Sequence, residues 1–189
     1  LISGIGQGFI LTTPLQLAIM TARLANGEQA VVPRLVRPAG KDADKAGVQF
    51  KPLGISKQSL DIVREGMNRV TNAPRGTAYR SRIAEEGMEM AGKTGTAQVR
   101  RITKAERETR VLKNHERPWR ERDHALFVGY APIDRPRYAV AVVVEHGGGG
   151  SKVAAPIARD LLIATQKRDP AANDHPVAED TPKTKSEEI

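Results

Sequence analysis

Residues 87–96 read GMEMAGKTGT, and two incompatible structures fit this stretch. Its glycines, together with Lys93 and Thr94, satisfy G-x-x-x-x-G-K-[ST], the loop that cradles nucleotide phosphates between a buried strand and a helix. The alternative is an extended strand, in which every second residue from Met88 to Gln98 shares one face. The fold of the chain depends on which structure forms around Lys93.

The residues on either side favour the strand. Upstream, residues 80–86 read RSRIAEE, which is too charged for the buried strand that precedes a phosphate loop, and Glu89 would repel a phosphate. Downstream, Gly95 and Thr96 are poor residues for the first turn of a helix. Only residues 142–145, VVVE, favour a nucleotide site, because they loosely resemble a magnesium-binding strand end. We therefore predict a strand and keep nucleotide binding as an alternative.

Such a strand has its own chemistry if it lies at an open sheet edge. The Lys93 ammonium attracts a carboxylate, and Thr94 and Thr96 supply hydroxyl donors. Gly95 lets another backbone approach and pair, and a backbone N–H just beyond it can stabilise an oxyanion during acyl transfer. Strict alternation places Lys93 opposite both threonines, so its long stem or a local twist must bring them together. The three residues K-T-G alone fit an ordinary edge strand with a solvated lysine as well as they fit a substrate-binding strand.

The remaining elements follow from caps and periodicity. A first helix begins at the Thr13-Pro14 cap and ends at Asn26-Gly27, and a second begins near Ser56. Residues 125–130 and 138–144 read as two strands joined by a short turn, which predicts an antiparallel hairpin. A last helix follows the glycines 147–150, and little regular structure is expected over residues 28–55. The helices carry apolar stripes, namely Leu17, Met20 and Leu24; Leu60, Val63, Met67 and Val70; Val153, Ile157 and Leu161. This order indicates an α+β domain with an antiparallel sheet flanked by helices.

The composition excludes several classes of site. The 189 residues include no cysteine, and the four histidines lack ligand spacing, so neither a metal nor another cofactor is expected. The net charge is +8, and much of it comes from residues 100–123. Acidic residues interrupt that stretch and Trp119 is its only aromatic, which predicts a solvated connecting loop and no nucleic-acid partner. No segment approaches the roughly 18 apolar residues of a membrane span.

Four segments together resemble the transpeptidase domain of class B penicillin-binding proteins, most closely the penicillin-binding protein 2 type. They are GIGQGFILTTPLQLA (4–18), AGKTGTAQV (91–99), HALFVGYAP (124–132) and YAVAVVVEHGGGG (138–150). The likeness extends from Leu1 to about Thr165. We therefore expect residues 1–167 to be the C-terminal part of a transpeptidase domain and residues 168–189 to be a disordered polar tail.

The resemblance implies a fold and a reaction. The fold is that of penicillin-binding transpeptidases and serine β-lactamases, of which this chain looks like the C-terminal half. In such enzymes a serine attacks a peptidoglycan stem peptide, the acyl group passes to an amine on a neighbouring strand, and β-lactams mimic the donor. The resemblance assigns four residues to substrate binding: Lys93, Thr94, Gly95 and Thr96. It makes Lys93 and Thr96 catalytic, with the Thr96 N–H in the oxyanion hole. It also implies cell-elongation membrane proteins as partners and an inner-membrane anchor, outside this sequence, with the domain facing the periplasm.

One departure from the family pattern is large. The nucleophile of the family lies in S-x-x-K and a second element in S-x-N, and no serine of this sequence starts either motif. We therefore expect this chain alone to be inactive. A non-catalytic penicillin-binding sensor or scaffold is the alternative. Four further residues are interpreted as structural or solvated rather than catalytic: His124, Tyr130, Arg100 and Arg101. The glycines 147–150 either line a cleft or serve only as a connection.

Overall fold

The computed structural model describes residues 10–35 and 50–169. The main elements are α1 (Pro14–Asn26), α3 (Lys57–Asn72), β1 (Ala91–Ala97), α4 (Lys104–Glu108), β2 (His124–Ala131), β3 (Tyr138–Val144) and α5 (Ala154–Arg168). Short 3-10 helices lie at Tyr79–Ser81, Asn114–Glu116 and Trp119–Glu121. The expected tail from residue 168 falls almost wholly outside the described residues, as do residues 36–49 of the expected loop. Within the described residues, no helix combines the length and apolar character that crossing a membrane requires.

The first two helices begin where their caps predict. The Thr13 hydroxyl accepts from the Gln16 backbone N–H at 3.2 Å, and the Gln16 side chain accepts from the Thr13 N–H at 2.8 Å. This reciprocal capping box confirms the predicted start of α1. Gly27 closes α1 with a left-handed φ of 74°, and its N–H donates to the Arg23 carbonyl. The hydroxyl of Ser56 caps α3 by accepting from the Ser59 backbone N–H.

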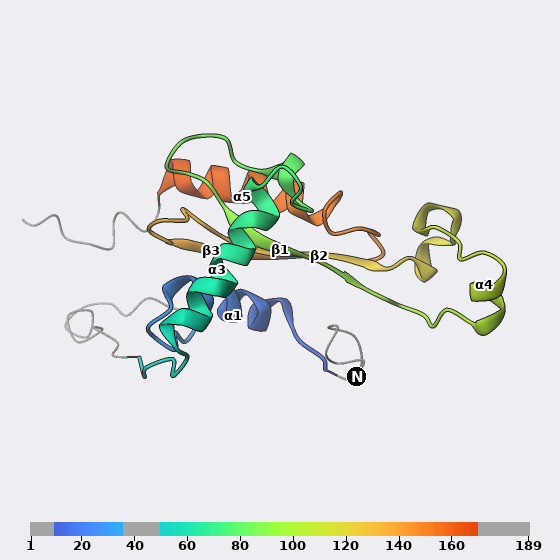
Figure 1. Cartoon of the computed structure of the whole chain (residues 1–189), viewed down its shortest axis with the longest axis horizontal. Coiled ribbons are helices and arrows are strands. Elements are labelled where there is room, and N and C mark those ends of the chain that lie inside the picture. Colours follow the sequence, from blue (N-terminus) through green and yellow to red (C-terminus); the bar gives the residue numbers. More distant parts are fainter. Residues whose placement is uncertain (1–9, 36–49, 170–189) are drawn as a thin grey trace, which may run out of the picture.

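The described strands form one antiparallel sheet in the order β1-β2-β3. Lys93 lies opposite Val128 in the first pairing, and Leu126 lies opposite Val143 in the second. The predicted hairpin and the α+β class are therefore confirmed, although β1 is shorter than the predicted strand. In Figure 1, α5 covers one face of the sheet and α1 lies on the other face. α3 packs against β1.

The main core lies between the sheet and α5. Phe127 from β2 is fully buried there, together with Met90 just before β1 and Leu162 from α5. The predicted apolar stripe of α5 is wrong, because Ile157 and Leu161 are 41% and 49% exposed. The buried face of α5 instead consists of Leu162 and three alanines, Ala154, Ala155 and Ala158. Alanine lets a helix backbone approach a sheet closely, so the small residues face the core.

The stripe of α1 is also displaced from its prediction. Thr21 and Ala25 are the buried residues of α1, whereas Met20 is 43% exposed. On α3, Leu60 and Met67 are buried as predicted, but Val63 is 42% exposed. The apolar stripes therefore predicted amphipathic helices correctly. They did not predict correctly which residues of each helix the sheet buries.

Residues 98–123, which connect β1 to β2, are more ordered than a solvated loop. They contain α4 and two of the 3-10 helices, and they project beyond the end of the sheet in Figure 1. We call this segment the arm. Ion pairs between its basic and acidic residues hold the arm in place. The composition had shown that both kinds of charge are present but not that they pair.

Candidate functional site

Lys93 lies in the middle of an antiparallel strand. It is the third residue of β1, and β1 continues through Thr94 and Gly95 to Ala97. A phosphate loop would require a helix to begin at this lysine, after a buried strand. The geometry around Lys93 is therefore not that of a nucleotide-binding loop, and the K-T-G residues lie on an extended backbone.

The Lys93 ammonium bends back toward its own strand. The side chain is exposed, and its Nζ donates to the Thr94 carbonyl oxygen at 2.7 Å. The flexible stem thus brings the charge to the backbone of the strand, in spite of the alternation of side chains. The Thr94 hydroxyl lies 3.2 Å from the Thr77 hydroxyl, and Thr96 is exposed further along β1. An ammonium and hydroxyl groups therefore lie along one short piece of strand.

The edge of β1 that faces away from β2 is covered only at the start of the strand. β2 pairs with one side of β1, and within residues 10–35 and 50–169 no strand pairs with the other side. Just before β1, the Met90 carbonyl accepts from the Thr71 hydroxyl at 2.7 Å and from the Asn72 amide at 3.0 Å. These α3 side chains fix the entry of the strand, and no sequence signal had identified them. Beyond this point, the K-T-G residues have an edge that an added peptide strand can pair with.

The glycine turn, residues 147–150, lies directly against the K-T-G strand. A Cβ atom on Gly150 would lie 2.4 Å from the Gly95 carbonyl oxygen and 2.2 Å from that of Leu126. Both distances are far below any van der Waals contact, so only glycine permits this approach. The turn therefore packs directly against the strand that carries the K-T-G residues.

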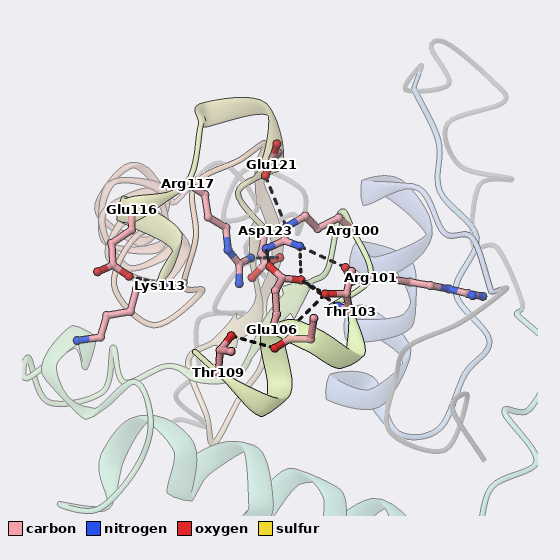
Figure 2. A network of polar contacts seen from close by, with 11 residues as sticks. Arg100, Arg101, Thr103, Glu106, Thr109, Lys113, Glu116, Arg117, Glu121 and Asp123 are labelled. Atoms are coloured by element: carbon pink, nitrogen blue, oxygen red, sulfur yellow. Dashed lines mark hydrogen bonds and ion pairs between the residues drawn. The ribbon is translucent and has the colours of Figure 1, made fainter. Parts of the chain in front are cut away.

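Paired charges hold the arm together (Figure 2). The Arg100 guanidinium donates to both carboxylate oxygens of Glu106, at 2.6 and 3.0 Å, and lies 3.6 Å from Glu121. The Glu106 carboxylate also accepts from the backbone N–H and hydroxyl of Thr103. The hydrogen bond from Arg100, reinforced by the Thr103 backbone, lowers the pKa of Glu106 to about 2. Arg100 is thus a structural residue of the arm.

Aromatic rings attach the arm to the glycine turn. The Trp119 ring lies 4.4 Å from the His146 ring, measured between centroids. The His146 backbone N–H donates to His124 Nδ1 at 2.9 Å, and the Gly148 N–H donates to the Asp123 carbonyl at 2.8 Å. His124 therefore has a structural hydrogen bond, and Tyr130 is 1% exposed in the core.

We expect acid to loosen the arm before it disrupts the core. Because the folded pKa of Glu106 is depressed from 4.5 to about 2, its contribution to stability is complete above pH 4.5 and is lost as the pH falls toward 2. Trp119, the only tryptophan of the 189 residues, should change its emission over this window. Glu106→Gln should show altered emission already at neutral pH and a smaller further change between pH 4.5 and 2. The remaining change comes from Glu116, because the hydrogen bond from the Lys113 backbone N–H also lowers the pKa of that carboxyl group. Identical titrations of the two proteins would contradict this role of Glu106.

An apolar groove runs alongside Lys93. Its volume is about 390 Å³, and Lys93 is the only charged residue among the described ones that line it. The others are Met20, Leu24, Val63, Gly66, Met67, Val70 and Val128, from α1, α3 and β2. The misplaced stripes of α1 and α3 are explained by this groove, because Met20 and Val63 face it and not the sheet core.

Comparison with known sequences identifies the family. The model of the penicillin binding protein transpeptidase domain matches residues 1–163. Peptidoglycan D,D-transpeptidase MrdA of Acinetobacter baumannii is 38% identical over 174 residues, which cover 88% of this chain and 24% of that protein. MrdA of Salmonella typhimurium is 33% identical over 167 residues, which cover 84% of this chain and 26% of that protein. The chain thus spans about a quarter of the length of these curated relatives.

Solved structures agree with the sequence comparison. The crystal structure of Pseudomonas aeruginosa PBP2 in complex with WCK 5153 is 38% identical with a TM-score of 0.65, over 86% of this chain and 32% of that one. The complex between PBP2 and MreC from Helicobacter pylori is 29% identical with a TM-score of 0.62, over 88% of this chain and 27% of that one. Since sequence and fold agree over most of its length, the chain belongs to the penicillin-binding protein transpeptidase family and is of the class B, penicillin-binding protein 2 type.

Proposed function

We propose that this chain forms one wall of the active site of a peptidoglycan D,D-transpeptidase. The observation that carries the proposal is the open edge of β1, along which the Lys93 ammonium and the Thr94 and Thr96 hydroxyls are exposed or half-buried. An extended peptide can add to this edge by backbone hydrogen bonds, with Gly95 leaving room for its approach. Lys93 and Thr94 then hold the terminal carboxylate of the donor peptide.

The reaction is an acyl transfer in two steps. A serine oxygen attacks the carbonyl carbon between the two terminal D-alanines, and the Thr96 backbone N–H stabilises the oxyanion that forms. The amide C–N bond breaks, and D-alanine leaves with a proton on its nitrogen. An amine of a neighbouring peptide then attacks the acyl-serine, loses a proton, and displaces the serine oxygen, which regains one. A β-lactam reacts with the serine as the donor peptide does in the first step, and it remains covalently attached to the serine.

We propose that the serine comes from a segment outside this sequence, because no S-x-x-K occurs among the 189 residues. The apolar groove beside Lys93 supports this proposal. Its exposed Met20 and Val63 are apolar surface that a further helix can bury, with a gain of about 25 cal/mol for each Å² removed from water. A helix on this groove brings its side chains close to Lys93, where the donor carboxylate is held.

The location and partners of the whole protein belong to the same proposal. Helicobacter pylori PBP2 was solved in a complex with MreC, and Pseudomonas aeruginosa PBP2 with WCK 5153. By analogy, the partners are cell-elongation membrane proteins, stem peptides and β-lactams, and an inner-membrane anchor outside this sequence holds the domain in the periplasm. A non-catalytic penicillin-binding sensor or scaffold is the second candidate, favoured only by the absence of the serine motif.

Covalent labelling with a fluorescent penicillin tests the proposal. A longer protein that carries this chain together with an S-x-x-K segment should acquire one label per molecule, whereas residues 1–189 alone should acquire none. Labelling of the chain alone would contradict the proposal that the nucleophile lies outside it. A longer protein that takes no label would contradict transpeptidase chemistry, and one that takes the label but forms no cross-linked peptide would be a sensor.

A further inference from the structure

A second cleft, which we call the basic cleft, lies between the arm and the glycine turn. Its volume is about 690 Å³, and it is lined by residues 113–115, Arg122, residues 146–149 and residues 151–153. Every ionisable side chain that lines it is basic: Lys113, His115, Arg122, His146 and Lys152. Among residues 10–35 and 50–169, no carboxylate lines the cleft, although the arm that forms one wall contains five.

The carboxylates of the arm are engaged elsewhere. Glu106 is held by Arg100, and the Glu116 side chain accepts from the Lys113 backbone N–H at 2.7 Å. Asp123, which is 8% exposed, accepts from the Asn114 amide at 3.1 Å and lies 3.6 Å from Arg117. In contrast, the ammonium groups of Lys113 and Lys152 form no ion pair within the described parts of the chain. Figure 2 shows the Lys113 side chain pointing away from the Arg100–Glu106 pair.

The backbone of the glycine turn adds hydrogen-bond donors. Within the described residues, the N–H groups of Gly149 and Ser151 have no hydrogen-bond acceptor. α5 starts at Ala154, after residues 151–153, and its N-cap residue Val153 makes no side-chain cap. Nothing lies within 4 Å of the position that a Cβ atom on Gly149 would occupy, so the turn is open on this side. Free N–H groups beside several cations favour an anion.

The cleft is close to the K-T-G strand but distinct from the Lys93 position. Gly150, the last residue of the turn, is in contact with Gly95 of β1. Lys93 does not line the cleft, and the arm that forms one wall begins after Ala97, four residues beyond Lys93 on β1. Four residues of strand correspond to roughly 13 Å. A carboxylate held at Lys93 and one held in the cleft are therefore different groups.

We propose that the basic cleft binds a second carboxylate of the peptide substrate, at a distance from the carboxylate that Lys93 holds. The inference rests on the proposed function. The carboxylate has two possible sources, namely a distal position of the donor peptide or the acceptor peptide whose amine attacks the acyl-enzyme. The two steps of the reaction separate these sources.

The test uses the longer protein that carries this chain and its nucleophile, with Lys113→Gln and Lys152→Gln combined. A synthetic stem peptide with free carboxylates is compared with the same peptide in which all carboxylates but the donor terminus are amidated. The double variant should raise the KM for the free-carboxylate peptide about fivefold, with no change for the amidated one. A higher KM in acylation assigns the cleft to the donor, and a higher KM in transfer assigns it to the acceptor.

The matched control removes the same charge from two residues that do not line the cleft. Lys57 and Lys104 are exposed lysines, each in an i,i+4 pair with an acidic residue, and their replacement by glutamine should leave both KM values unchanged. If the cleft variant leaves both KM values within about 1.5-fold, or if the control raises them equally, the proposal is overturned. Penicillin acylation of the unaltered protein is measured in parallel. Its absence would overturn the proposed function, whatever the peptides show.

Discussion

Lys93→Ala should lower the rate of acylation by penicillin about 100-fold or more, in the longer protein that carries this chain and its nucleophile. The Lys93 ammonium is the charge at the open edge of β1, and its Nζ already lies 2.7 Å from the strand backbone at Thr94. A carboxylate that pairs with this edge loses its charged partner in the variant. Stopped-flow mixing with a fluorescent penicillin measures the rate constant.

The fold should survive this substitution. Lys93 is exposed, and its side chain makes one hydrogen bond, to a backbone oxygen of the neighbouring residue. The melting temperature of Lys93→Ala should therefore match that of the unaltered protein. Lys57→Ala, at the exposed start of α3, is the control for loss of a positive charge and should acylate normally. An acylation rate within about threefold of normal for Lys93→Ala would remove this lysine from the site.

Gly150→Ala should have the second largest effect, because it forces the glycine turn away from the sheet. The new methyl group would lie 2.2 Å from the Leu126 carbonyl oxygen and 2.4 Å from that of Gly95. Both obstacles are backbone atoms of paired strands and have little freedom to move. We expect a loss of about 1–3 kcal/mol in the free energy of unfolding, measured by urea denaturation.

This substitution should also impair the site. Since the turn is in contact with Gly95, moving it disturbs the strand that carries Lys93 and Thr96. The acylation rate should fall even at temperatures where the variant is fully folded. Gly149→Ala is the neighbouring control, because no atom lies within 4 Å of its Cβ position, and it should be nearly neutral. Equal effects of the two substitutions would show that backbone flexibility, and not the close contact, makes Gly150 important.

Local signals were reliable where one short segment contains the whole interaction. Thr13 and Gln16 cap α1 as predicted because both partners lie within one turn of each other. The hairpin of β2 and β3 follows from two apolar runs and a short turn. The order of elements, the α+β class and the strand through Lys93 depended on such signals and on motifs in the order of a known family.

Predictions failed where the answer depended on a distant segment. Ile157 and Leu161 lie one turn apart on α5 as their spacing predicts, yet both are exposed, whereas Val153 precedes the helix and packs against the core. Periodicity indicates which residues lie together but not which face the sheet covers, and the alanine face of α5 allows the closer approach. The charge mixture of the arm likewise did not indicate which charges pair, because Arg100 reaches Glu106 and Glu121 only after the arm has folded.

The sequence by itself determined the starts of α1 and α3, the end of α1, the strand that carries Lys93, and the family to which the chain belongs. Tertiary structure alone decided that the glycine turn touches Gly95, that α3 closes the entry of β1, and that Lys113 and Lys152 meet across one cleft. The physical reason is the range of the interactions. Caps, turns and strand periods act between neighbours in the chain, whereas a cleft forms from residues that only packing brings together.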